Sequence, residues 1–217
     1  MAIQTMRSFS LIDKILIQAN LALETIFTVS NDSRKNPADT IVTSDNLTVD
    51  EQNKSASLMR VNHTGEICAQ ALYRGQSMCS HSKKTRDMLE KSCDEETDHL
   101  AWTKQRLLEL NSRTSCLNIF FYCNSYMIGL LAGFAGDQWS LGFVAETEIQ
   151  VAKHLEKHLK KLPKQDLKSR IILEKMRDEE MQHQKAAFQA GAAELPFVIK
   201  KLMRVNSKVM TILTAWI

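Results

Sequence analysis

The sequence predicts an all-α protein, a four-helix bundle with additional N-terminal and C-terminal helices. Three observations lead to this prediction. The 217 residues include only three prolines and seven glycines, fewer than a turn-rich β fold would need. Long stretches repeat apolar residues at helical spacing. Two of these stretches also carry Glu-x-x-His on a face that is otherwise apolar.

The composition is that of an ordinary globular protein with one core, because 44% of the residues are hydrophobic and 24% are charged. A net charge of +3 is too small to argue for nucleic acid, which we do not expect as a partner. The five cysteines form no CxxC pair, and MAIQTMRSFS is not a signal peptide. These features predict a cytoplasmic protein without a zinc finger or a disulfide framework. The lack of a GxGxxG motif argues against a nicotinamide or flavin domain.

Apolar periodicity and helix-end signals divide the chain into six helical segments. Residues 1–47 form an N-terminal helix (10–28) and a polar loop (30–46), and residues 48–217 form the bundle domain. The second helix is expected to start near Thr48 or Asp50 and to end near 77, and the third is expected to cover 82–111. The fourth is expected to end at Leu162, the fifth to cover 165–190, and the sixth to start near Glu194 and Pro196. The sequence DQWS at 137–140 is expected to break or kink the fourth helix, and Gly191 to cap the fifth.

Glu66 lies where a core residue is expected. At about 100° of rotation per residue, Met59, Ala69 and Tyr73 fall within about 60° of it on the same helical face. Burial of an ionised carboxylate is costly unless a partner charge or a metal compensates it. Glu66 therefore predicts charged or metal-binding partners elsewhere in the chain.

The third and fifth helices supply such partners. Glu96 lies three residues before His99, and Glu180 lies three residues before His183. Each glutamate shares its face with apolar side chains, so each helix directs a Glu and a His from one turn into the bundle.

The fourth helix offers two glutamates, which helical phase separates. Glu148 shares its face with seven apolar residues, Leu141, Val144, Val151, Ala152, Leu155, Leu159 and Leu162. Glu146 lies about 160° away and is expected to point outward. His154 lies about 120° from the Glu148 face, so it is not an obvious ligand.

The chain thus contains one pattern twice, a lone glutamate followed by Glu-x-x-His one antiparallel helix later. The separation is thirty residues from Glu66 to Glu96 and thirty-two from Glu148 to Glu180. Two helices with one Glu each and two with Glu-x-x-His form the carboxylate-bridged dinuclear metal site of four-helix bundles. Four carboxylates neutralise two divalent ions, and mixed oxygen and imidazole ligands suit iron or manganese. One Glu-x-x-His alone would be a weak signal, but two at matched spacing are a strong one.

Several nearby residues have alternative interpretations. His63 is better explained by helix packing or by support of a ligand than as a seventh ligand. Glu95 and Glu179 either orient the ligand histidines or face water. Tyr73 either lines a substrate pocket or packs in the core. His154 either assists proton movement near the site or has a surface or packing role.

At this level of detail the chain resembles the bacterial demethoxyubiquinone hydroxylase family, ferritin-like di-iron monooxygenases of ubiquinone biosynthesis. The resemblance rests on the stretches LMRVNHTGEICAQALYRGQ, EETDHLAWTKQRLLEL, LAGFAGDQWSLGFVAETEIQVAKHLEKHLKKLP and MRDEEMQHQKAA. It covers about residue 50 to the C-terminus. It implies two iron ions as the cofactor and six ligands, which are Glu66, Glu96, His99, Glu148, Glu180 and His183.

The resemblance also implies an activity. Members of the family hydroxylate the ring of a polyprenylated methoxy-methyl-benzoquinol (demethoxyubiquinol) with O2, the penultimate step towards ubiquinone. It implies a polyprenylated quinol and O2 as substrates, and it leaves open a partnership with other ubiquinone-biosynthesis proteins. Two alternatives are a ferritin-type iron-handling protein without monooxygenase activity and a scaffold that binds quinone or lipid.

The C-terminal segment predicts peripheral attachment to the cytoplasmic face of the cell membrane, with an anionic membrane surface as partner. No acidic residue follows Glu194, and four basic residues fall within an arc of about 100°, namely Lys200, Lys201, Arg204 and Lys208. Residues 117–136 are uncharged and long enough to span a bilayer, but Asn118, Asn124, Ser125 and three glycines make them a poor spanning helix. The alternative is that both segments pack together as ordinary core.

Overall fold

The computed structural model describes residues 10–27, 34–42 and 46–217, and these residues form helices and connecting turns only. The α-helices are α1 (Leu11–Phe27), α2 (Val49–Cys79), α3 (Lys83–Glu109), α4 (Asn118–Phe134), α5 (Asp137–Lys161), α6 (Leu167–Gln189) and α7 (Phe197–Trp216). A 3-10 turn, η1 (Pro37–Thr40), lies between α1 and α2. Residues 1–9, 28–33 and 43–45 lie outside the described residues. They include most of MAIQTMRSFS, the last residue of the expected N-terminal helix and parts of the expected polar loop.

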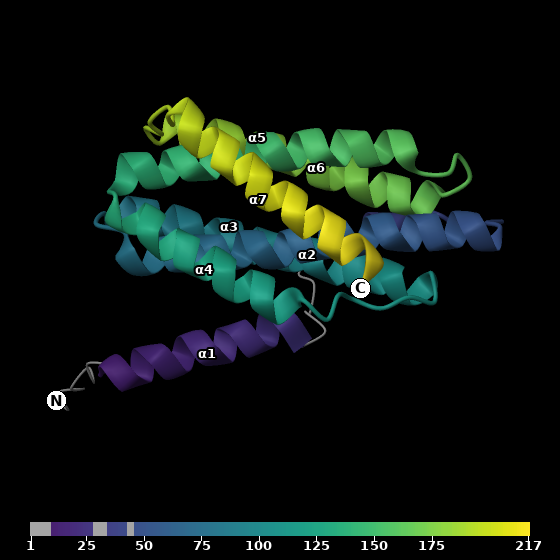
Figure 1. Ribbon diagram of the computed structural model, residues 1–217, viewed down its shortest axis with the longest axis horizontal. Helices are drawn as coiled ribbons and strands as arrows, with labels where there is room; N and C mark the ends of the chain where they lie inside the picture. The colour runs from purple at the N-terminus through teal and green to yellow at the C-terminus, as the bar shows by residue number, and fades with distance from the viewer. Residues whose placement is uncertain (1–9, 28–33, 43–45) are drawn as a thin grey trace, which may run out of the picture.

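Four of the helices form the bundle (Figure 1). Helices α2 and α3 pack as one antiparallel pair, α5 and α6 as a second, and the pairs meet through α2 with α5 and α3 with α6. Helix α4 lies along α2 on the outside of the bundle, α7 crosses the bundle obliquely, and α1 lies beside α2 and α4. The expected all-α bundle with additional N-terminal and C-terminal helices is confirmed.

Two apolar clusters fill the bundle at different heights. One contains Met59, Trp102, Leu155 and Met176 from the four helices, and the other contains Tyr73, Cys93, Val144 and Ala187. On every bundle helix the glutamates and histidines of interest lie between the residues of these two clusters. The bundle therefore encloses a polar layer between two apolar layers, which keeps water from both ends.

The predicted helix ends have clear physical causes. Thr48 caps α2 in a capping box, in which its side chain accepts from the Glu51 amide and the Glu51 carboxylate accepts from the Thr48 amide. Gly191 follows α6 with a φ of 102°, a left-handed conformation that favours glycine. Both predicted ends are confirmed.

The chain breaks close to the expected place, but at Ala135 and Gly136 and not within residues 137–140, which form the first turn of α5. The described residues therefore contain seven α-helices where six segments were expected. Gly136 adopts a φ of 103° between α4 and α5. Asp137 then begins α5, and its carboxylate accepts hydrogen bonds from the backbone amides of His81 (3.0 Å) and Ser82 (2.8 Å). This contact joins the start of α5 to the turn between α2 and α3.

Helix α4 approaches α2 closely through small residues. A Cβ placed on Gly129 would lie 2.2 Å from the carbonyl oxygen of Leu72, and one on Gly75 would lie 2.4 Å from that of Tyr126. The two backbones are therefore in direct contact, which a larger side chain would prevent.

Among the described residues, no helix combines the length and hydropathy that a membrane span requires.

The close approach of α2 and α4 gives a stability prediction. We expect Gly129→Ala to lower the free energy of unfolding by about 1–3 kcal/mol, because the new methyl group must push α4 away from α2. Thermal and chemical unfolding followed by circular dichroism measure the change. Gly65→Ala is the matched control, since a Cβ there meets nothing within 4 Å and alanine favours a helix by about 1 kcal/mol. Equal destabilisation by both substitutions would contradict the proposed packing.

Candidate metal centre

The four bundle helices bring six sequence-predicted side chains into one buried cluster. Two overlapping groups of ligand atoms each lie within 4.8 Å of one another. The first, here called the His99 subsite, consists of Glu66, Glu96, His99 and Glu180, and the second, the His183 subsite, consists of Glu96, Glu148, Glu180 and His183. Glu96 and Glu180 belong to both groups, which is the position that a carboxylate bridge between two metals requires.

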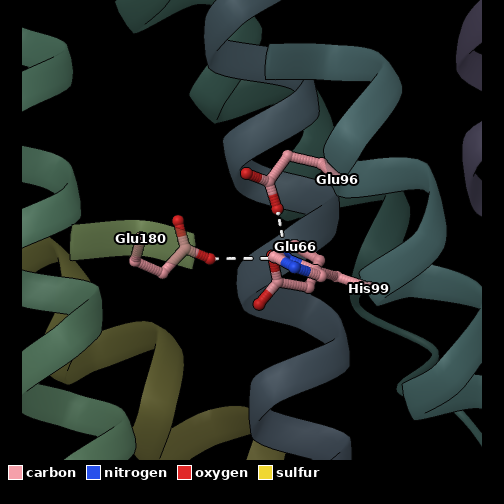
Figure 2. Close-up of side chains that lie close together, drawn as sticks. All are labelled: Glu66, Glu96, His99 and Glu180. Atoms are coloured by element: carbon pink, nitrogen blue, oxygen red, sulfur yellow. Dashed lines mark hydrogen bonds and ion pairs between the residues drawn. The ribbon is translucent and has the colours of Figure 1, made fainter. Parts of the chain in front are cut away.

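The histidines turn the same nitrogen toward the carboxylates. Nδ1 of His99 lies 2.9 Å from Glu96 and 3.4 Å from Glu180, and Nδ1 of His183 lies 3.3 Å from each of the same two glutamates. Figure 2 shows Glu66, Glu96 and Glu180 converging on the His99 ring from α2, α3 and α6. Nδ1 of each ring thus faces the space where a shared cation would lie.

Burial makes this cluster costly without a cation. The six side chains are between 0% and 7% exposed. Burial, followed by the charge of Glu96, raises the pKa of Glu66 well above its usual value, and burial with the charge of Glu180 does the same for the pKa of Glu148. Burial would lower the pKa of His183, but its hydrogen bonds to Glu180 and Glu96 raise that pKa to about 12. In the absence of cations the cluster therefore holds protons, which bound metal ions would replace.

Several carboxylate oxygens also fit a metal better than a protein partner. Oε1 of Glu96, Oε2 of Glu148 and Oε1 of Glu180 are buried and accept no hydrogen bond of good geometry from the described residues. The first lies 3.3 Å from Nδ1 of His183 and the third lies 3.4 Å from Nδ1 of His99. Buried polar atoms are almost always well paired, so three poorly satisfied oxygens facing one cluster indicate a missing cation. Four carboxylates and two imidazoles are hard or intermediate donors, which suit iron or manganese. The residues therefore fit a dinuclear metal centre.

The far nitrogen of each histidine contacts a glutamate from the opposite motif. Nε2 of His99 lies 2.8 Å from Oε2 of Glu179, which directly precedes Glu180 on α6. Nε2 of His183 lies 2.5 Å from Oε2 of Glu95, which directly precedes Glu96 on α3. Each Glu-Glu-x-x-His motif therefore orients the histidine of the other, and the interpretation of Glu95 and Glu179 as orienting residues is the one that the structure supports.

Tyr73 is a core residue that also contacts the cluster. It is fully buried, packs with Val144 and Ala187, and donates a hydrogen bond from its hydroxyl to Oε1 of Glu148. It does not line either of the cavities described below. The tyrosine therefore holds the carboxylate of Glu148 through the same oxygen that lies 3.8 Å from Nδ1 of His183.

Two residues that the sequence argument set aside lie outside the cluster. Glu146 is not among the grouped ligand atoms, as expected, but the expectation that it points outward is wrong, because it is only 9% exposed. Gln150 donates to it at 2.7 Å and also to the Lys200 carbonyl, so α7 covers this side of α5. His63 is buried and pairs with the Thr103 hydroxyl at 3.0 Å, which agrees with a packing role.

A large apolar cavity lies beside the cluster. It has a volume of about 870 Å³ and is bounded by α2, α4, α5 and α7. Its lining is almost entirely hydrophobic and includes Leu72, Phe121, Phe143, Leu202 and Met203. The volume is in the range of small-molecule and cofactor sites. Sequence reasoning did not find this cavity, because its walls come together only when α4 and α7 cover the bundle.

A small cavity of about 40 Å³ adjoins this space and reaches Glu66 of the cluster. Glu66 and His154 line it, and it shares with the apolar cavity five residues, Gly65, Gln150, Val151, Ser207 and Met210. Nε2 of His154 is buried without a hydrogen-bond partner among the described residues. Burial lowers the pKa of His154 to about 4, so the ring is neutral at neutral pH. Its ring lies 3.9 Å from that of His158, which is held by Asn62 at 2.9 Å.

The helical bundle and its buried, glutamate-bridged cluster define a class, the ferritin-like proteins with a carboxylate-rich dinuclear metal site. Comparison with known families identifies the group within this class. Residues 53–214 match the model of the family described as ubiquinone biosynthesis protein COQ7, and the chain belongs to that family.

Individual relatives agree over nearly the whole chain. A 3-demethoxyubiquinol 3-hydroxylase of Coxiella burnetii (strain Dugway 5J108-111) is 50% identical over 211 residues, 97% of this chain and 98% of its own. One of Polynucleobacter asymbioticus is 49% identical over 93% of this chain and 97% of its own. A third, of Legionella pneumophila (strain Paris), is 44% identical over 95% of this chain and 97% of its own.

The two glutamates of α5 test the assignment of ligands. We expect the purified protein to bind close to two metal ions, and Glu148→Ala to lose metal while Glu146→Ala retains it, because only Glu148 faces the cluster. Elemental analysis after anaerobic loading and desalting measures the metal content. Retention of both ions by Glu148→Ala, or loss of metal in Glu146→Ala, would show that the fourth bundle helix has been assigned the wrong ligand.

Proposed function

We propose that this protein is a di-iron monooxygenase that hydroxylates the ring of a polyprenylated demethoxyubiquinol with O2, the penultimate step towards ubiquinone. Two iron ions would be held by Glu66, Glu96, His99, Glu148, Glu180 and His183. The relatives named 3-demethoxyubiquinol 3-hydroxylase support the substrate, since they align over almost the full length of the chain. The donor set supports iron.

The observation that carries the proposal is the position of the apolar cavity beside the buried cluster. A polyprenylated quinol combines a long hydrocarbon tail with a polar ring. The apolar cavity of about 870 Å³ suits the first part of such a tail, and the small cavity, with Glu66 and His154 on its wall, suits one edge of the ring. An iron-storage protein needs no such apolar cavity, so this feature favours the hydroxylase over a ferritin-type iron-handling protein.

The chain contributes positioning and exclusion of water. When bound, a di-iron centre supplies electrons to O2 and Lewis acidity to the resulting oxygen species. One oxygen atom enters a ring C–H bond, and the other leaves as water with two protons and two electrons from a reductant outside the chain. The neutral Nε2 of His154 is placed to accept a hydrogen bond from a ring hydroxyl in the small cavity. The apolar layers above and below the cluster keep bulk water from the reaction.

We further propose that the protein attaches to the surface of the cytoplasmic face of the cell membrane. Helix α7 turns its buried Thr214 toward the bundle and presents an exposed apolar stripe that includes Val205, Val209 and Trp216. Lys201, Arg204 and Lys208 are exposed along one edge of this stripe. Helix α4, the facing wall of the apolar cavity, also exposes Phe120, Leu131 and Phe134. A prenyl tail could then remain in the bilayer while its ring reaches the cluster.

The oxidative activity can be tested with labelled oxygen. We expect anaerobic iron loading, reduction and addition of demethoxyubiquinol with ¹⁸O2 to give a product that has gained one labelled oxygen atom. Substitution of His99 or His183 by alanine should lower turnover at least about 100-fold, since even the partners that orient metal ligands contribute 10–100-fold. Circular dichroism should show the helical content retained.

The control for this assay is His81→Ala, at an exposed position in the turn between α2 and α3. It should leave turnover unchanged. Full turnover by an iron-free protein with both ligand histidines replaced would refute the di-iron mechanism, and iron uptake without product would favour the iron-handling alternative.

Membrane attachment can be tested by sedimentation with anionic vesicles. We expect binding by the full chain and a roughly hundredfold loss when Lys201, Arg204 and Lys208 are replaced by glutamine, because each basic residue near an anionic surface contributes about 1 kcal/mol. High salt should weaken binding in the same way. The matched control replaces three exposed lysines at the end of α5 and in the turn that follows it, Lys160, Lys161 and Lys164, and should bind as the unchanged protein does. No binding by the full chain would contradict the proposal, and carbonate-resistant binding would indicate insertion.

A further inference from the structure

The short segment 34–42 lies outside the residues matched by the family model, yet it packs on the bundle next to the metal centre. Asn36 is buried, caps η1 by accepting from the Ala38 amide at 2.9 Å, and donates to Gln105 of α3 at 3.0 Å. Ala38 is buried against the apolar cluster of α3, α5 and α6, and η1 contacts α6. The segment is therefore fixed against the two helices that carry Glu-Glu-x-x-His.

Arg34 begins this segment and reaches both of those helices. Its Nε lies 2.5 Å from Oδ2 of Asp98 on α3, and its Nη1 donates to Oε1 of Glu179 on α6. Its guanidinium also lies 5.1 Å from the centre of the Trp102 ring, and the Trp102 indole donates to the Arg34 carbonyl at 3.4 Å. The side chain is 38% exposed, but both acidic partners are almost fully buried.

Glu179 is the residue that links Arg34 to the metal centre. One carboxylate oxygen, Oε1, pairs with Arg34 and with Lys175 at 2.9 Å, and the other, Oε2, accepts from Nε2 of His99 at 2.8 Å. Two cationic side chains therefore hold the outer oxygen of this carboxylate and fix its orientation toward His99.

The His183 subsite has no equivalent support among the described residues. Glu95, which orients His183, is 34% exposed, and Nζ of its cationic neighbour Lys91 lies 3.4 Å away on a side chain that is 77% exposed. Both are on α3, so no second element holds this pair. The two ligand histidines are therefore held unequally. Glu179, which orients His99, lies in a contact of α6 with α3 and segment 34–42, whereas His183 is oriented by the partly exposed carboxylate of Glu95.

We propose that Arg34 is a positioning residue that orients His99 through Glu179 and thereby selectively strengthens metal binding at the His99 subsite. A fixed anionic acceptor on Nε2 holds the ring in the tautomer whose Nδ1 binds metal and increases its basicity. Removal of the arginine frees Glu179 to rotate or to interact with Lys175 alone, and His99 then loses its fixed acceptor. The N-terminal segment therefore makes the two metal subsites unequal in affinity.

Cobalt(II) titration of the full chain tests this proposal, because the metal can be followed by its absorbance and by competition with a chelator without any turnover. We expect Arg34→Gln to weaken one of the two binding events about tenfold or more and to leave the other unchanged. Arg34→Lys should restore part of the affinity, since lysine keeps the charge but cannot bind Asp98 and Glu179 with a rigid fork. Lys91→Gln is the matched control on the other subsite and should change neither event.

Single-histidine backgrounds identify the subsite that is affected. In His183→Ala, which retains the His99 subsite, Arg34→Gln should weaken the remaining binding event, whereas in His99→Ala it should have no effect. An equal effect in the two backgrounds, or no effect in either, would overturn the proposal. Unfolding temperatures measured in parallel distinguish a structural role, which would lower the stability of all variants without selecting one subsite. Because the measurement uses metal alone, its outcome does not depend on the proposed substrate.

Discussion

This structure depends on one constraint, which is that four glutamates repel one another and are removed from water in the same buried cluster. Glu66, Glu96, Glu148 and Glu180 form two overlapping groups that share Glu96 and Glu180, and all four are almost entirely shielded from water. Such a group is unstable as four anions, because neither water nor the protein interior can screen them. Protons or multivalent cations must compensate the charge, so the stability of the bundle and the chemistry of its centre are coupled.

The bundle meets this constraint by separating tasks between its layers. Apolar side chains above and below the cluster provide cohesion, while the cluster itself contributes little without its cations. The leading glutamates of the two motifs exchange partners across α3 and α6, so that each helix fixes the histidine of the other. Helices α4 and α7 then cover the side near Glu66 and leave an apolar cavity there. The apolar walls of this cavity suit an amphiphilic substrate better than a free ion.

The sequence predicted the elements and the six clustered residues because both depend on periodicity. Helical phase distinguished Glu148 from Glu146, and the structure places only Glu148 in the cluster. Helical phase, however, gives only the angle of a residue around its own helix and does not show which other helices pack there. The burial of Glu146 beneath α7 was therefore missed. The role of Arg34 was missed for a related reason, since a basic residue in a polar run gives no local sign of a contact with α6. A cavity walled by four helices is likewise a tertiary property.

The contact of Asp137 with the turn between α2 and α3 sets a limit on changes in chain length. It fixes the start of α5 beside the start of α3, and Glu148 follows eleven residues later, about three helical turns along. One inserted residue between them would turn Glu148 by about 100° and advance it by about 1.5 Å. The connection at residues 110–117, at the opposite end of the bundle, has no such relation to the cluster. Insertions and deletions during evolution should therefore be tolerated at that end and eliminated at the Asp137 end.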